Sequence, residues 1–299
     1  LESITSDSNN QLNLARLQFP QHKLHGRSSQ VSQLLDLCNN IGSSTESKTI
    51  FISGYSGVGK SAIVEHVKKS IKHTNVQKHT NVHFISGKFD QLQQMEPLSA
   101  IDAAFTEFSN SIIQQGPTSL LRTKKAIIDA INGDVGVLTN AFPCLCKIVG
   151  ESAHAPTDMS FLAAKNYFNF IFRKFVCAIA TSSCPIILFL DDLQWADTFS
   201  LQLMCFLAAE TQIKHFIFIG TYRDNEVYDD HPLTFQLNEL EHKKVDITHL
   251  NIGSIAKEDV NKLISDTIQM SMRLTKSFSD VVYKKTSGNA LFVIQFLQS

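Results

Sequence analysis

The sequence has few of the features that mark membrane, secreted or zinc-binding proteins. Its longest apolar runs are about seven residues, far below the roughly 18 that a membrane-spanning helix needs, and its N-terminus lacks a charged stretch followed by an apolar one. The six cysteines are scattered rather than set at disulfide or zinc-site spacings. We therefore expect a cytoplasmic protein with reduced thiols and no membrane partner.

An excess of charge of either sign is also lacking. Lys and Arg total 27 against 28 Asp and Glu, which gives a formal net charge of −1. Because no overall positive field is present to attract phosphate backbones, a nucleic-acid partner is not expected. The 299 residues, 43% of them hydrophobic, suffice for one large globular domain with a smaller companion.

Apolar runs typical of buried strands alternate with stretches of helical periodicity, which predicts an α/β fold with a parallel sheet. Strands are expected at 49–53, 82–86, 185–190, 215–221 and 245–250. Helices are expected at 29–38, 60–72, 98–112, 161–179 and 201–209. Glycines and prolines interrupt residues 118–158, which are expected to be irregular with short helices.

The pattern becomes wholly helical after Asn251, which indicates a second, smaller domain. We expect a polar linker at 1–24, a nucleotide-binding α/β domain at 25–252 and a helical lid domain at 253–299. Since the chain starts at Leu1 rather than Met and stops in a helical stretch, we expect it to be a piece of a longer polypeptide whose lid continues further.

One eight-residue stretch, Gly54–Ser61, fits the phosphate-loop (P-loop) pattern G-x-x-x-x-G-K-[ST] between an expected strand and an expected helix. Its glycines let backbone amides point at phosphate oxygens, and the following helix adds its positive end. Lys60 would bridge the β- and γ-phosphates, and Ser61 would bind magnesium through its hydroxyl. The alternative is an ordinary glycine turn before a helix. The expected nucleotide-binding residues are Gly54, Tyr55, Ser56, Gly57, Val58, Gly59, Lys60, Ser61 and Ala62.

Two aspartates, Asp191 and Asp192, follow the most apolar expected strand. Magnesium needs a carboxylate from a neighbouring strand end, so Asp191 would hold the metal through water. Asp192 would face the γ-phosphate and orient the attacking water. The alternative is that the pair caps the helix that follows from Thr198 or lies solvated in a turn.

Arg223 ends the next buried strand. At the phosphate edge of the sheet it would contact the γ-phosphate and report its presence. The alternative is a salt bridge with Asp224 or Glu226, worth little if it is exposed.

Several stretches together make residues 25–299 similar to an Orc1-type AAA ATPase module of the STAND class, the signal-transduction ATPases with numerous domains. The Leu-Gln-Trp-Ala-Asp and Tyr-Arg-Asp-Asn-Glu-Val segments resemble those of large hybrid proteins that also carry Ser/Thr kinase-like, sensor and histidine-kinase parts. The stretches that carry the resemblance are 25–27, 54–61, 86–91, 190–197, 220–227, 231–233, 286–289 and 292–293.

The resemblance implies a five-stranded sheet in which the strand ending at Arg223 lies between the P-loop strand and the Asp191 strand. It implies that Gly26 and Arg27 line the adenine and ribose, and that the turn at Gly288 and Asn289 in the lid approaches the base. Many relatives carry proline after this Gly-Asn pair, where this chain has Ala290.

These observations predict a magnesium-dependent ATPase with Lys60, Asp192 and Arg223 as its catalytic residues, acting as a slowly hydrolysing switch in a multidomain signalling protein. A guanine-specifying [NT]-K-x-D motif is missing, which favours ATP over GTP. Expected partners are ATP or ADP, neighbouring kinase or sensor domains, and a second copy in nucleotide-dependent self-association. The alternatives are an origin-recognition-type DNA-binding ATPase and a nucleotide-binding scaffold that does not hydrolyse.

Overall fold

The computed structural model divides the chain into two compact units, one formed by residues 29–253 and one by 1–28 together with 254–299. It describes residue 19 and residues 23–41, 46–78, 81–93, 96–132, 134–151 and 160–299. Most of the linker expected at 1–24 lies outside the described residues.

The larger unit is built on a five-stranded sheet in the order β2-β3-β4-β1-β5, with every neighbouring pair parallel. This confirms the predicted α/β P-loop fold and places β4 between β1 and β3. All six residues of β3 are buried, because both faces of a parallel sheet are covered by helices. The strands are β1 (Lys48–Ser53), β2 (His83–Lys88), β3 (Ile186–Asp191), β4 (Phe216–Tyr222) and β5 (Ile247–Asn251).

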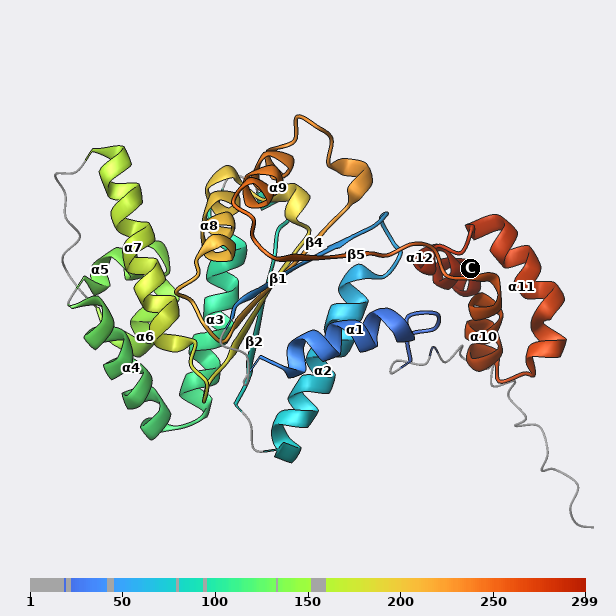
Figure 1. Cartoon of the computed structure of the whole chain (residues 1–299). Coiled ribbons are helices and arrows are strands. Elements are labelled where there is room, and N and C mark those ends of the chain that lie inside the picture. The colour runs from blue at the N-terminus through green and yellow to red at the C-terminus, as the bar shows by residue number, and fades with distance from the viewer. Residues whose placement is uncertain are drawn as a thin grey trace, which may run out of the picture. The chain divides into compact units, whose positions relative to one another are not determined.

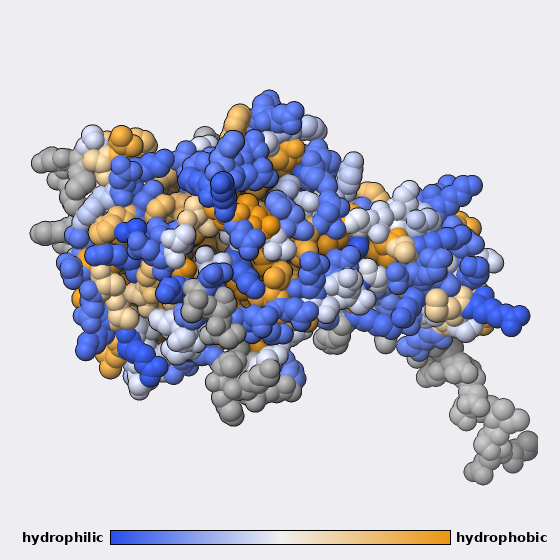
Figure 2. Space-filling model, in the orientation of Figure 1, coloured by the Kyte–Doolittle hydropathy of each residue, from blue (hydrophilic) through white to orange (hydrophobic). Residues whose placement is uncertain are grey.

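Helices cover both faces of this sheet (Figure 1). On one side lie α1 (Ser28–Asn39) and α2 (Lys60–Lys78), and on the other lie α3 (Ser99–Gln114), α8 (Thr198–Ala209) and α9 (Pro232–His242). Hydrophilic residues predominate in the space-filling view, and hydrophobic residues show between them (Figure 2).

The main hydrophobic core lies between the sheet and the helices on the α3 side, and phenylalanine dominates it. Phe105 of α3 packs edge-on against Phe172 and Phe175 of α7 (Phe161–Ile179), with ring centroids 5.8 and 5.3 Å apart. The helical Phe spacing in α7 therefore serves packing.

Residues 117–149 differ from the sequence-based expectation, because most of them are helical. Gly116 and Pro117 follow the end of α3 and begin α4, since proline is accommodated in the first turn of a helix, where its missing N–H is not needed. Ile127 and Ile131 of α4 are buried, and α4 packs on α7. The helices of this stretch are α4 (Pro117–Ile131), α5 (Val135–Ala141) and α6 (Cys146–Val149). Similarly, α2 continues to Lys78 rather than ending near residue 72.

The smaller unit contains α10 (Lys257–Ile268), α11 (Met272–Thr286) and α12 (Ala290–Gln298) around a core of their own. Its grouping includes residues 25–28, which the sequence assigned to the α/β domain. A Cβ on Gly26 would lie 2.8 Å from Oδ2 of Asp259 in α10, so only glycine allows this close approach.

In the described part of the chain, none of the helices combines the length and apolarity that crossing a membrane requires.

Candidate nucleotide site

The loop between β1 and α2 has a backbone that only glycine adopts readily. Gly54 has a φ of +149°, and a Cβ there would lie 2.2 Å from the carbonyl oxygen of Ile252. Gly59 has a φ of +100°, with open space around the position of an added Cβ. A phosphate-binding loop needs a tight turn and a backbone without side chains, so that its N–H groups can come close to the phosphate oxygens. Val58 is buried under the loop, and Tyr55 is 63% exposed.

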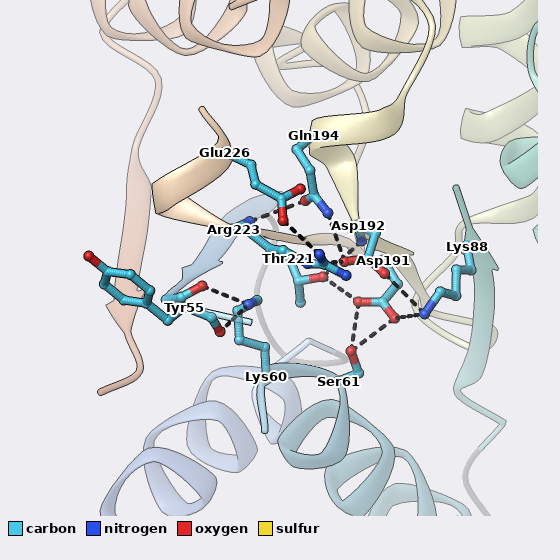
Figure 3. A network of polar contacts seen from close by, with 11 residues as sticks. Tyr55, Lys60, Ser61, Lys88, Asp191, Asp192, Gln194, Thr221, Arg223 and Glu226 are labelled. Atoms are coloured by element: carbon cyan, nitrogen blue, oxygen red, sulfur yellow. Dashed lines mark hydrogen bonds and ion pairs between the residues drawn. The ribbon is translucent and has the colours of Figure 1, made fainter. Parts of the chain in front are cut away.

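Lys60 begins α2 and is 6% exposed. Its ammonium donates hydrogen bonds to the carbonyl oxygens of Gly54 and Tyr55, at 2.7 and 2.9 Å (Figure 3). Burial lowers its pKa, while Asp192 and other carboxylates act in the opposite direction. The lysine is thus held inside the loop at the point where the helix begins.

Ser61, the next residue, joins the loop to the end of β3. Its hydroxyl donates to both carboxylate oxygens of Asp191, at 2.8 and 2.9 Å. Asp191 also accepts a short hydrogen bond from the hydroxyl of Thr221, a fully buried residue of β4. Helix α2 and strand β4 therefore fix the carboxylate at the end of β3 beside the phosphate loop (Figure 3).

Asp192 has a left-handed backbone, with φ 58° and ψ 50°, and is 6% exposed. Its N–H donates to the Thr221 hydroxyl at 3.1 Å, and its Oδ1 accepts from the side-chain amide of Gln194 at 2.9 Å. Asp tolerates this conformation better than most residues, but such outliers concentrate at functional sites.

Lys88, at the end of β2, supplies a cation to the acidic pair. Its ammonium lies 3.0 Å from Oδ2 of Asp192 and 3.5 Å from Oδ2 of Asp191. Partial burial by itself lowers the pKa of Lys88, but the hydrogen bond to Asp192 and the two nearby carboxylates outweigh it and raise the pKa.

Arg223 makes one of the salt bridges that were expected as the alternative, and it also lies beside the acidic pair. Its Nη1 lies 2.6 Å from Oε1 of Glu226, which is the salt bridge, and its Nε lies 3.6 Å from Oδ1 of Asp192. The guanidinium also stacks on Trp195, with its carbon 4.4 Å from the ring centroid. The guanidinium of Arg223 therefore lies near Asp192 while Glu226 and Trp195 fix its position.

The structure brings Lys60, Ser61, Asp191, Asp192 and Arg223 together at the carboxyl ends of β1, β3 and β4. It also excludes the capping alternative for the acidic pair, because Asp197 caps α8 by accepting the N–H of Ser200.

Sequence reasoning assigned no role to Lys88, Gln194 or Thr221. The signal that identifies Lys88 is register: it is paired with Asp191 between adjacent parallel strands. Thr221 similarly precedes the strand end at Tyr222. Gln194 lies in a short helical turn after β3, which carries no comparable signal.

The residues expected at the base and ribose lie in the smaller unit, where they have structural contacts. Arg27 is 6% exposed, and burial lowers its pKa, opposed by Asp259. Asn289 caps α12 by accepting the N–H groups of Leu291 and Phe292. The nucleotide role expected for Gly26, Arg27 and the Gly288 turn stays a prediction.

The donor set fits magnesium. The Ser61 hydroxyl and the Asp191 carboxylate are hard oxygen ligands, and Mg²⁺ is commonly bound by one or two protein groups plus phosphates and water. The described residues include no cluster of three or more His, Cys, Asp or Glu side chains that could hold a metal ion.

Comparison with known proteins gives the class. Residues 23–219 match the family model of the AAA ATPase domain, and the chain belongs to this family. It is similar to hybrid signal transduction histidine kinase G of Dictyostelium discoideum, with 25% identity over 345 residues, covering 94% of this chain and 10% of that protein. The chain thus corresponds to about a tenth of that relative's length.

Solved structures share the fold. A Drosophila ORC structure bound to DNA matches with a TM-score of 0.54 and 12% identity, covering 93% of this chain and 55% of that one. The Aeropyrum pernix ORC2 protein, in ADPNP and ADP complexes, matches with a TM-score of 0.51 and 12% identity, covering 91% and 60%. This chain therefore has the fold of Orc-type AAA ATPases.

Proposed function

We propose that this chain is a magnesium-dependent ATP-binding module that hydrolyses ATP slowly and acts as a switch in a longer signalling protein of the STAND class. The observation that carries the proposal is the hydrogen bonding of Ser61 to Asp191 beside the buried Lys60. A hydroxyl, a carboxylate and an ammonium at the mouth of a glycine loop are the groups that a magnesium-bound triphosphate requires.

Binding rests on the loop and on Lys60. The loop amides and the start of α2 attract the β- and γ-phosphates, and Lys60 turns from the carbonyl oxygens of Gly54 and Tyr55 to these phosphates. Ser61 and Asp191 hold magnesium, which when bound neutralises charge on the phosphate oxygens.

Hydrolysis rests on Asp192 and Arg223. Oδ1 of Asp192 contacts Gln194 and Arg223, and Oδ2 contacts Lys88, so we expect Oδ2 to accept a hydrogen bond from the attacking water through its further lone pair. Arg223, anchored by Glu226 and Trp195, contacts the γ-phosphate and stabilises charge as the β–γ bond breaks. Turnover in this scheme is slow unless a partner supplies a further cation.

The switch role is supported by the relative, a signal transduction histidine kinase much longer than this chain. We propose that loss of the γ-phosphate changes the contacts of Arg223, and that the helical C-terminal unit passes this state to neighbouring kinase or sensor domains or to a second copy. The proposed site of action is inside the cell, where ATP is present.

The proposal is tested by measuring nucleotide binding and phosphate release from Mg-ATP with the purified chain. Lys60→Ala removes the ammonium at the loop, whereas Lys69→Ala removes an exposed lysine of the same helix and serves as the matched control. We expect binding and slow phosphate release in the unmodified chain and in Lys69→Ala, and neither in Lys60→Ala.

Bound ATP without phosphate release would leave a nucleotide-binding scaffold and overturn the hydrolytic half of the proposal. Phosphate release that survives Lys60→Ala would show that the activity does not belong to this site.

A further inference from the structure

Gln194 is a buried polar residue, 4% exposed, that the proposed reaction does not use directly. Its side-chain amide nitrogen donates to Oδ1 of Asp192 at 2.9 Å, and its side-chain oxygen accepts the backbone N–H of Arg223 at 3.1 Å. One amide side chain therefore connects the end of β3 to the end of β4, and both connected residues belong to the proposed hydrolytic site (Figure 3).

The backbone of Gln194 is held from a third side by His231. Nδ1 of His231 accepts the N–H of Leu233 at 3.0 Å, so the proton of the neutral ring lies on Nε2. Nε2 lies 3.1 Å from the carbonyl oxygen of Gln194 and donates to it. Because His231 is also the N-cap of α9, the turn that carries Gln194 is tied to the start of that helix.

The chemistry of an amide suits this position. The Gln194 NH₂ group orients the carboxylate of Asp192 without neutralising it, and the carbonyl oxygen of the same amide takes the Arg223 N–H. A residue with only donors or only acceptors cannot make both bonds.

We propose that Gln194 is a positioning residue that couples Arg223 to Asp192. This inference rests on the proposed function. Contact of Arg223 with a γ-phosphate shifts the end of β4, and Gln194 transmits this shift to the Asp192 carboxylate, which orients the attacking water. Gln194 thus makes alignment of Asp192 depend on the nucleotide state.

Two substitutions distinguish the two hydrogen bonds of the Gln194 side chain. Gln194→Glu keeps the shape and the acceptor for the Arg223 N–H, but it removes the donor to Asp192 and adds a like charge. Gln194→Met removes both hydrogen bonds at similar volume. Gln33→Met, at an exposed glutamine of α1, is the matched control.

We expect both Gln194 variants to lower kcat by about 10- to 100-fold and to raise KM for Mg-ATP by a much smaller factor, about twofold to fivefold, because the γ-phosphate contact of Arg223 is weakened. Thermal melting of each variant checks that it folds. Wild-type kcat in Gln194→Glu would overturn the inference, and so would equal losses in kcat and in ATP affinity, because those indicate a general structural defect.

A binding measurement judges the inference even if the chain does not hydrolyse. The ratio of the Kd for Mg-ADP to the Kd for Mg-ATP should fall in Gln194→Met and in Arg223→Met. In the double variant this ratio should be no lower than in Arg223→Met alone. Additive effects would contradict the coupling. An absence of phosphate release in the unmodified chain would instead contradict the proposed function.

Discussion

The hydroxyl of Ser61 lies 2.8 and 2.9 Å from the two carboxylate oxygens of Asp191, a residue 130 positions further along the chain. This contact unites the phosphate loop with the acidic strand end, the two features that the sequence shows separately. It depends on the sheet order, because only the single strand β4 separates β1 from β3.

Ser61→Ala should raise the magnesium concentration needed for half-maximal ATP binding, because it removes one of two protein oxygens at the proposed metal site. Loss of a group that only supports a metal ligand typically weakens metal affinity by about 10- to 100-fold, so we expect roughly a tenfold or larger increase when a ligand itself is lost. The measurement is an ATP-binding titration at varied Mg²⁺. Ser61→Thr keeps the hydroxyl and should behave as the unmodified chain does, and an equal shift in both variants would contradict the assignment.

Thr221→Val should destabilise the chain even without ligand. Thr221 is fully buried and supports both aspartates, so valine leaves the Asp192 N–H and one Asp191 oxygen without that partner. We expect a loss of about 1–3 kcal/mol in the free energy of unfolding, measured by urea denaturation. Thr221→Ser retains the hydroxyl and should recover most of this loss; a variant pair with equal stability would show that the hydrogen bonds contribute little.

Gly54→Ala should destabilise the loop through geometry alone. The added Cβ would meet the Ile252 carbonyl oxygen at 2.2 Å, on a backbone with φ +149°. The strain is of the order of 1–3 kcal/mol, and a lower melting temperature and weaker ATP binding should accompany it. Gly253→Ala has nothing within 4 Å of its new Cβ and is the control. The account of the loop fails if the two variants melt alike.

His83 should make the folded chain sensitive to acid. It is 4% exposed, and burial lowers its pKa below the ordinary value of 6.5. Below pH 6.5 the unfolded chain therefore binds a proton that the folded chain resists, and the free energy of unfolding falls by up to about 1.4 kcal/mol per pH unit until the folded-state pKa is reached.

His83→Phe removes this titration while keeping a ring beside Phe108, whose centroid lies 5.3 Å from the histidine ring. The drop in melting temperature between pH 7.5 and 5.5 should be smaller in the variant than in the unmodified chain. Equal drops would assign the acid sensitivity to other groups, of which His25 is one, since burial lowers its pKa as well.

The sequence predicts the strands and the phosphate loop well because their signals are local. An apolar run such as that of β3, Ile186–Asp191, is explained by burial on both faces of a parallel sheet. The stretch 117–149 was predicted poorly because Gly116 and Pro117 follow the end of one helix and begin the next, which local pattern does not distinguish.

The charged groups of the site were predicted in part, for a different reason. Asp191 and Arg223 end apolar strands and are visible from the sequence, whereas the contacts of Lys88 depend on sheet register. The contacts of Gln194 depend further on the left-handed conformation of Asp192, which no local residue pattern predicts.

The most direct test of the account is single-turnover hydrolysis of Mg-ATP by Asp192→Asn, measured beside its ATP affinity. Asn keeps the shape but removes the negative charge that accepts the proton of water, so we predict wild-type affinity with hydrolysis slowed by about 10²- to 10⁴-fold. Asp230→Asn, at an exposed position, is the control and should hydrolyse at the wild-type rate. Hydrolysis by Asp192→Asn at the wild-type rate would contradict the central claim that the acidic strand end orients the attacking water.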